Sequence, residues 1–194
     1  MVFQLAAVII LCIFYGCYFG KMFAQRQRGI QTDQIGKGKT GAARTIELTM
    51  KAATLSVPIV ELISINRNTN MLPGWVRYIG MGLALLGDLV FVISVWTMRD
   101  SWRAGVSKTD QTELITDGIY QISRNPAFLG FDLTYIGIFL MFSNWVLAAC
   151  SMFAMIMFHL QIVKVEETFL VSAFGDDYAE YKKKVNRYLG RKSV

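Results

Sequence analysis

The sequence predicts an all-α integral membrane protein with about five transmembrane helices, including a short C-terminal helical hairpin, and a cytoplasmic interfacial helix at the C-terminus. Three observations predict this fold. Hydrophobic residues make up 54% of the 194 residues and the mean hydropathy is +0.39, which is too apolar for an ordinary soluble domain. The apolar residues gather in five runs. Lys and Arg gather in alternate connections between those runs, as expected for a chain that crosses a bilayer repeatedly.

The five apolar runs differ in how easily they can cross a bilayer. They cover residues 2–19, roughly 52–65, 78–97, 127–142 and 145–163. A helix needs about 20 residues to cross about 30 Å of hydrocarbon, so the first, third and fifth runs are comfortable spans. The second run is long enough only if it starts near Thr45, and Pro58 and Glu61 predict a kinked helix packed against protein. The fourth run is short, and the turn Ser143-Asn144 joins it to the fifth as a helical hairpin.

Charge placement predicts the orientation of the bundle. The first loop, the third loop and the C-terminal tail hold 17 Lys and Arg residues, against 2 in the second loop and none in the fourth. Basic loops favour the cytoplasmic side, so we expect a multi-pass protein with its N-terminus outside and its C-terminus cytoplasmic. This topology and the anionic headgroups of membrane lipids account for the net charge of +6. No nucleic-acid partner is therefore expected.

Two sequence features suggest ligand sites but are better interpreted as structural. Residues 36–41, GKGKTG, match a dinucleotide-binding fingerprint, but no β-strand precedes them, so we interpret them as a flexible cytoplasmic linker. The three cysteines lie inside apolar runs at spacings that fit no metal site, and no metal is predicted. Glycines at positions 16, 20, 80, 82 and 87 predict close helix packing.

Three acids within the runs, Glu61, Asp88 and Asp132, are costly to place in lipid. We therefore expect them to face the bundle interior. Two interpretations stay open at this point: they could be structural, forming hydrogen bonds between helices or packing in the protonated form, or they could handle a substrate or an ion.

Two motifs near the C-terminus carry the strongest functional signal. The first, G-x-Y-x-x-x-R-x-P-x-[aromatic]-x-G, runs from Gly118 to Gly130, and the second, which begins at Glu166-Glu167 and ends at Arg187, is E-E-x-x-L-x-x-x-F-G-x-x-Y-x-x-Y-x-x-x-V-x-R. On a continuous helix His159, Val163, Glu166, Glu167 and Leu170 would form one stripe. The two motifs, on either side of the hairpin, resemble the isoprenylcysteine carboxyl methyltransferases and their phospholipid methyltransferase relatives.

The resemblance covers about residues 114–187 and implies a division of the chain. Residues 1–98 would form three transmembrane helices with a basic cytoplasmic loop, and residues 99–194 a methyltransferase region with a cofactor loop, the hairpin and a C-terminal cap. It implies S-adenosylmethionine as methyl donor, S-adenosylhomocysteine as product, and a lipid or a prenylated small molecule or peptide as acceptor. Carboxyl methylation of an isoprenylcysteine-like substrate is the first expectation. Asn125, Phe128 and Gly190 depart from the family, which usually has His, Tyr and Pro there.

Site residues follow from the same resemblance. Catalytic roles are implied for Arg124, Glu167 and Arg187, because arginines can hold carboxylates bidentately and a glutamate can bind the cofactor's ammonium or fix an arginine. The implied cofactor-binding residues are Leu114, Gly118, Tyr120, Asn125, Leu129, Gly130, His159, Val163, Glu166, Glu167, Phe174, Tyr178 and Tyr181.

Three other functions compete with carboxyl methylation. A phospholipid N-methyltransferase would need a base to deprotonate its amine acceptor, and His159 or a glutamate could serve. A membrane sterol reductase would use a nicotinamide cofactor and needs more spans than this chain has. A non-catalytic transporter or structural protein would use Asp88 and Asp132 instead. No oligomeric state is predicted.

Overall fold

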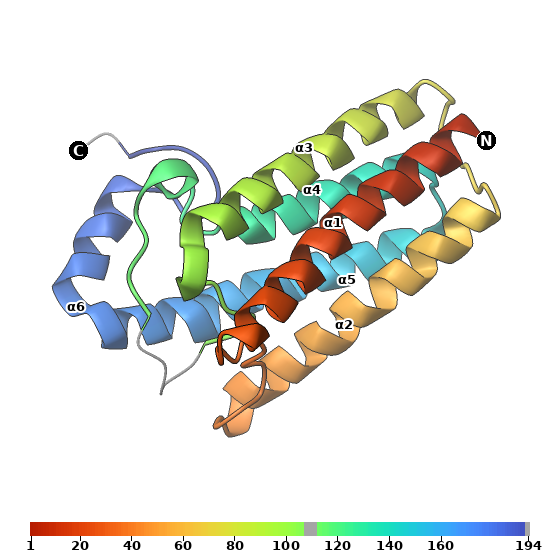
Figure 1. Cartoon of the computed structure of the whole chain (residues 1–194). Coiled ribbons are helices and arrows are strands. Elements are labelled where there is room, and N and C mark those ends of the chain that lie inside the picture. The colour runs from red at the N-terminus through yellow and green to blue at the C-terminus, as the bar shows by residue number, and fades with distance from the viewer. Residues whose placement is uncertain (107–111, 193–194) are drawn as a thin grey trace.

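Within the part of the chain that the structure describes, five α-helices form an elongated bundle and a sixth forms a cap at one end (Figure 1). The computed structural model describes residues 1–106 and 112–192. The α-helices are α1 (Val2–Gln27), α2 (Gly41–Asn66), α3 (Val76–Met98), α4 (Pro126–Met141), α5 (Trp145–Gln161) and α6 (Glu167–Lys184). Two short 3₁₀ helices, η1 (Arg99–Ser101) and η2 (Gly118–Gln121), follow α3, and a π-helical turn, η3 (Ile162–Glu166), joins α5 to α6. The predicted all-α fold is confirmed.

The lengths of the helices agree with an integral membrane protein. Within the described residues, four helical segments are long and apolar enough to cross a bilayer: α1, α2, Val76–Ser101 and the apolar part of Trp145–Lys184. The fifth apolar helix, α4, is shorter, as the sequence predicts. At about 1.5 Å per residue, its 16 residues reach about 24 Å. The Asn144 side chain accepts a hydrogen bond from the backbone N–H of Leu147 and so caps α5 after the short turn.

The three basic connections lie at the same end of the bundle. The loop between α1 and α2, the segment after α3 and the cap built on α6 meet there, while the N-terminus lies at the opposite end (Figure 1). This arrangement agrees with the alternation inferred from the charges. The orientation of the bundle in a membrane stays a prediction, as does the division of the chain at residues 98 and 99.

Glycine lets α3 and α4 pack backbone against backbone. A Cβ atom at Gly137 would lie 2.5 Å from the backbone nitrogen of Ala84, and one at Gly87 would lie 2.6 Å from that of Thr134. Such contacts exclude any side chain. The prediction of close packing is therefore confirmed at Gly80 and Gly87, whereas a Cβ at Gly16, Gly20 or Gly82 would meet nothing within 4 Å. This contact fixes α4, and with it the polar segment that precedes it.

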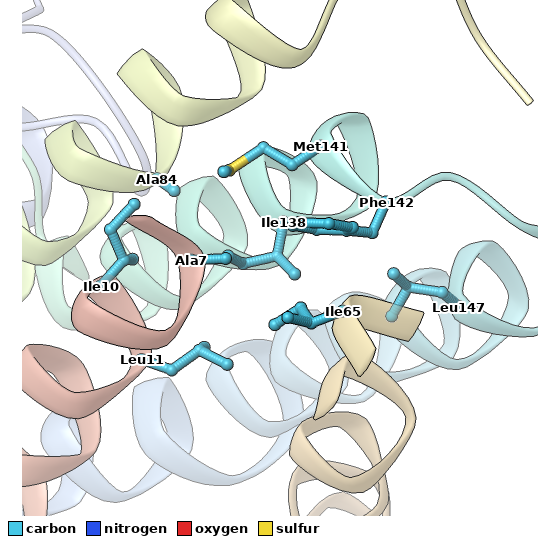
Figure 2. Packing of buried hydrophobic residues seen from close by; sticks show 9 residues of the cluster. All are labelled: Ala7, Ile10, Leu11, Ile65, Ala84, Ile138, Met141, Phe142 and Leu147. Atoms are coloured by element: carbon cyan, nitrogen blue, oxygen red, sulfur yellow. The ribbon is translucent and has the colours of Figure 1, made fainter. Parts of the chain in front are cut away.

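Five helices share a core near the end that carries the N-terminus. Figure 2 shows its buried side chains, which come from α1 (Ala7, Ile10, Leu11), α2 (Ile65), α3 (Ala84), α4 and the residue after it (Ile138, Met141, Phe142) and α5 (Leu147). Removing such side chains commonly costs about 2 to 5 kcal/mol. This cluster therefore stabilises the bundle at the end opposite the cap.

The loop between α1 and α2 is bonded to the bundle, so its interpretation as a flexible linker is corrected. Glu47, fully buried on α2, accepts hydrogen bonds from the backbone N–H of Gly36 at 2.5 Å and from Gln161 Nε2 at 3.1 Å. Lys39 from the same loop forms a buried ion pair with Glu47. Asp33 forms an ion pair with Lys51 of α2, with 2.6 Å between Oδ2 and Nζ. A buried carboxylate needs such partners, and here the loop supplies them.

The prediction that the three acids of the apolar runs face the bundle interior is confirmed for two of them. Glu61 and Asp88 are buried inside the bundle, whereas Asp132 is only half-buried. Among the described residues, neither carboxyl oxygen of Glu61 or Asp88 has a hydrogen-bond partner. Interhelical hydrogen bonding therefore does not explain these two acids.

Candidate functional site

The helix that carries Glu166 and Glu167 contains a π turn. Residues 162–166 are π-helical, and this extra residue in the turn changes the direction of the side chains that follow. The single stripe expected from a continuous α-helix is therefore wrong. His159 is exposed, and its Nδ1 lies 2.6 Å from the Tyr188 hydroxyl. The two glutamates diverge: Glu167 is buried at 7% exposure, and Glu166 lines a cavity.

Glu167 lies at the centre of a cluster of cations. Arg187 donates two hydrogen bonds to its carboxylate, Nε to Oε1 at 2.8 Å and Nη2 to Oε2 at 3.0 Å. Arg124 Nη2 lies 3.0 Å from Oε1, and Lys182 Nζ lies 3.5 Å from Oε2. The hydrogen bond to Glu167 raises the pKa of Arg187 above its ordinary value. The three residues with implied catalytic roles thus meet at one point.

The tail after α6, residues 185–192, is named here the C-terminal strap, and it is bonded to the segment before α4. The backbone N–H of Arg124 donates to the carbonyl of Asn186 at 3.1 Å, and Asn125 Nδ2 donates to the carbonyl of Arg187 at 3.0 Å. The N–H of Gly190 donates to the carbonyl of Ile122 at 2.8 Å. These bonds place both arginines beside Glu167 although they lie far apart in the sequence.

A cavity of about 150 Å³, named here the polar cavity, opens beside this cluster. Eight of the implied site residues line it: Leu114, Tyr120, Arg124, Asn125, Glu166, Phe174, Tyr178 and Tyr181. The segment after α3 adds Ser101, Arg103, Gly105 and Glu113, and Phe128 and Phe169 add aromatic surface. Of these six, only Phe128 belongs to a motif found in the sequence.

Hydrogen bonds fix the wall of the polar cavity. Arg124 Nη1 donates to the Tyr178 hydroxyl at 2.7 Å, and the Tyr181 hydroxyl donates to the carbonyl of Tyr120 at 2.6 Å. Arg124 Nε is buried and has no hydrogen-bond partner among the described residues. Burial raises the pKa of the Tyr120 phenol, which keeps it protonated. An unpartnered buried donor costs about 1 to 3 kcal/mol, so a ligand acceptor there would be stabilising.

The other implied cofactor-binding residues lie outside the lining of this cavity. A Cβ at Gly130 would lie 2.8 Å from Cβ of Phe91, which places this glycine in the contact between α3 and α4. Gly118 adopts a φ of +56°, a conformation that favours glycine. Leu129, Val163 and His159 do not line the cavity either. Within residues 1–106 and 112–192, no three His, Cys, Asp or Glu side chains gather as metal ligands.

A second cavity, of about 420 Å³, lies between the helices and is named here the apolar cavity. Its walls come from all five bundle helices and include Tyr18, Phe91, Phe131 and Phe158. Gly105, Ala127 and Phe128 line both cavities. Sequence reasoning missed the apolar cavity, because aromatic residues that line a cavity and those that fill a core look alike in an apolar run.

Comparison with known proteins points to one family. A family model described as phospholipid methyltransferase matches residues 75–177, more than half of the chain. The chain is similar to a probable protein-S-isoprenylcysteine O-methyltransferase of Oryza sativa subsp. indica, with 29% identity over 58% of this chain and 60% of the relative. It is also similar to proteins named protein-S-isoprenylcysteine O-methyltransferase in Schizosaccharomyces pombe and Saccharomyces cerevisiae. The first is 39% identical over 37% of this chain and 30% of the relative, and the second is 31% identical over 55% and 46%.

These matches cover 60% or less of the length of each of the three relatives. The resemblance inferred from the two motifs is confirmed, since the family match and the named relatives agree with it. The all-helical, largely apolar bundle is consistent with that assignment. On the match over residues 75–177, the chain belongs to the phospholipid methyltransferase family.

Proposed function

We propose that this protein transfers a methyl group from S-adenosylmethionine to the carboxylate of an isoprenylcysteine-like lipid at the cytoplasmic membrane interface. One observation carries the proposal: a polar cavity with charged walls shares Gly105, Ala127 and Phe128 with a larger apolar cavity inside the bundle. A water-soluble donor and a lipid acceptor need two such compartments in contact. The names of the relatives, protein-S-isoprenylcysteine O-methyltransferases, support the choice of acceptor.

The residues of the polar cavity fit S-adenosylmethionine by their chemistry. Glu166 offers a carboxylate for an ammonium group, and the unpartnered Arg124 Nε offers a donor for a carboxylate. Phe128, Phe169 and Phe174 offer aromatic surface for an adenine ring. The cavity is smaller than the roughly 300 Å³ of common ligand pockets, so we expect its walls to move apart on binding. When bound, the cofactor supplies an electrophilic methyl group on a sulfonium.

The chain's own residues contribute alignment and exclusion of water. Glu167, which is itself bound by Arg187, holds Arg124 against the wall of the polar cavity, and Tyr178 binds the other terminal nitrogen of Arg124. The aromatic walls exclude water from the space between the two cavities. A carboxylate is already a competent nucleophile, so the protein needs to orient it rather than deprotonate it.

The position of His159 removes one candidate base for the amine of a phospholipid. An amine must lose a proton before it attacks, so the site would need a base. His159, the histidine that could serve, lines neither cavity and instead lies against Tyr188. The other candidates, Glu166 and Glu113, lie in the polar cavity.

The test has two arms on the purified full chain in detergent. Calorimetry with S-adenosylmethionine should give a saturable heat that S-adenosylhomocysteine competes away. A product assay with labelled cofactor should then methylate N-acetyl-S-farnesylcysteine and leave phosphatidylethanolamine unmodified. Saturable binding with methylation of phosphatidylethanolamine alone would assign the amine reaction instead. The absence of any heat would refute cofactor binding and favour a non-catalytic role.

A further inference from the structure

The apolar cavity contains an ion pair. Lys51 of α2 and Asp33 of the first loop both line this cavity, with 2.6 Å between Nζ and Oδ2. Their side chains are 39% and 30% exposed. An ammonium has three donors, and within the described residues Asp33 is the only hydrogen-bonding partner of this one. Two donors of Lys51 therefore remain for a ligand in a cavity whose other walls are largely aromatic and aliphatic.

Backbone contacts place this ion pair at the border between the two cavities. Asp33 is paired with Ala104 through two hydrogen bonds: Gln34 N–H donates to the carbonyl of Ala104 at 2.8 Å, and Ala104 N–H donates to that of Thr32 at 3.0 Å. The residue after Ala104 is Gly105, which lines both cavities. Lys51 therefore lies beside the wall that the polar and apolar cavities share.

Asp33 is held in place from both sides. Its Oδ1 accepts a hydrogen bond from the backbone N–H of Ile35 at 3.2 Å, and its Oδ2 contacts Lys51. Close packing supports the same loop, because a Cβ at Gly105 would lie 3.0 Å from the nitrogen of Ile35. A fixed carboxylate keeps the long lysine side chain directed along the cavity wall, where an unpaired lysine would extend toward water.

The arginines that could otherwise meet an acceptor carboxylate are engaged elsewhere. Arg187 donates hydrogen bonds to Glu167 through Nε and Nη2, and it lines neither cavity. Arg124 uses its two terminal nitrogens for Tyr178 and Glu167. Arg103, in the polar cavity, donates through Nη1 to the carbonyls of Asp100 and Trp102. On the side of the apolar cavity, Lys51 is the cation that lines the wall.

We propose that Lys51 binds the carboxylate of the acceptor and so determines specificity for an acidic lipid, an inference that rests on the proposed function. The acceptor's hydrocarbon chain occupies the apolar cavity, and its charged end lies at the shared wall. A charge-assisted hydrogen bond to the ammonium orients that carboxylate. An uncharged headgroup gains much less from Lys51, so the protein discriminates by charge before any reaction takes place.

The test compares binding of N-acetyl-S-farnesylcysteine with binding of its carboxamide, by calorimetry on the full chain without cofactor. The wild type should prefer the acid by about tenfold, the scale of one charge-assisted contact. Lys51→Met keeps the apolar stem, removes the charge and should reduce this preference to about twofold or less. Lys51→Arg should restore most of it, and Lys183→Met, at an exposed lysine of α6, should match the wild type.

Two outcomes would overturn the proposal. One is an acid preference that survives Lys51→Met, and the other is a wild type that does not distinguish the two compounds. A third arm uses phosphatidylethanolamine: if Lys51→Met weakens its binding and leaves that of the acid unchanged, the ammonium binds a headgroup phosphate and the proposal is wrong. Calorimetry with S-adenosylmethionine on the same proteins serves as the folding control. If the wild type gives no heat with S-adenosylmethionine, the proposed function is refuted. The comparison of the acid with its carboxamide would still decide the role of Lys51.

Discussion

Replacing Glu167 by glutamine removes the negative charge that three cations share. The Arg124 side chain is 4% exposed, whereas those of Arg187 and Lys182 are 32% and 44% exposed. Breaking a buried ion pair costs about 3 to 5 kcal/mol, but exposed partners add about 1 kcal/mol or less each. Only the ion pair with Arg124 is buried enough to contribute close to the full free energy of a buried pair. We therefore expect Glu167→Gln to lower the free energy of unfolding of the cap by about 3 kcal/mol. Only uncharged acceptors, the Tyr178 hydroxyl and the glutamine oxygen, would then face the buried guanidinium.

A double-mutant cycle with Arg124→Met measures this coupling. Because the second change removes the uncompensated buried charge, the double variant should be more stable than the sum of the two single effects by about 2 kcal/mol. Thermal unfolding in detergent reports the stabilities, and calorimetry with S-adenosylmethionine reports the site. Because Glu167 positions Arg124, which lines the polar cavity, Glu167→Gln should also weaken cofactor binding by about tenfold, the scale of one charge-assisted contact. Additive stabilities together with unchanged cofactor affinity would refute the account of Glu167 as the centre of the cluster.

Three further predictions concern the packing and the two cavities. Gly137→Leu should abolish folding, because a Cβ there would lie 2.5 Å from the backbone of α3. Size-exclusion chromatography should then show no monodisperse peak. The control Gly82→Ala has open space around it and should behave as wild type. Tyr181→Phe removes the hydrogen bond to the Tyr120 carbonyl and should cost about 1 kcal/mol in thermal unfolding, with cofactor affinity reduced several-fold; an unchanged melting temperature would contradict this. Phe131→Trp should fill part of the apolar cavity and weaken acceptor binding while cofactor binding stays unchanged, and an equal loss of both would show that the cavities are not separate sites.

The parts of the structure predicted correctly from the sequence depend on local signals. Apolar run lengths gave the helices, and the short run before Ser143-Asn144 gave the hairpin, because membrane helices must satisfy their backbone internally. The helices and the hairpin are each set by residues within one or two segments. The family resemblance singled out Arg124, Glu167 and Arg187, and the structure brings these three distant residues together in one cluster.

The parts that were missed depend on contacts between distant segments. A regular helix was expected through residues 162–166, where nothing in the sequence marks the π turn that separates His159 from Glu166. The loop of residues 36–41 looks flexible because its partner, Glu47, is a buried acid on a membrane helix, and sequence alone did not show that the two meet. The apolar cavity needs five helices to exist, so no single run predicts it.

The two cavities draw on different halves of the chain. The polar cavity is lined by residues between Met98 and Tyr181, whereas much of the apolar cavity is built by α1, the first loop and α2. Those elements lie before residue 75, where the family match begins. Under the proposed function, changes confined to the first two helices would alter which lipid is accepted and leave the polar cavity intact, so that new acceptor preferences arise while the chemistry of methyl donation is retained.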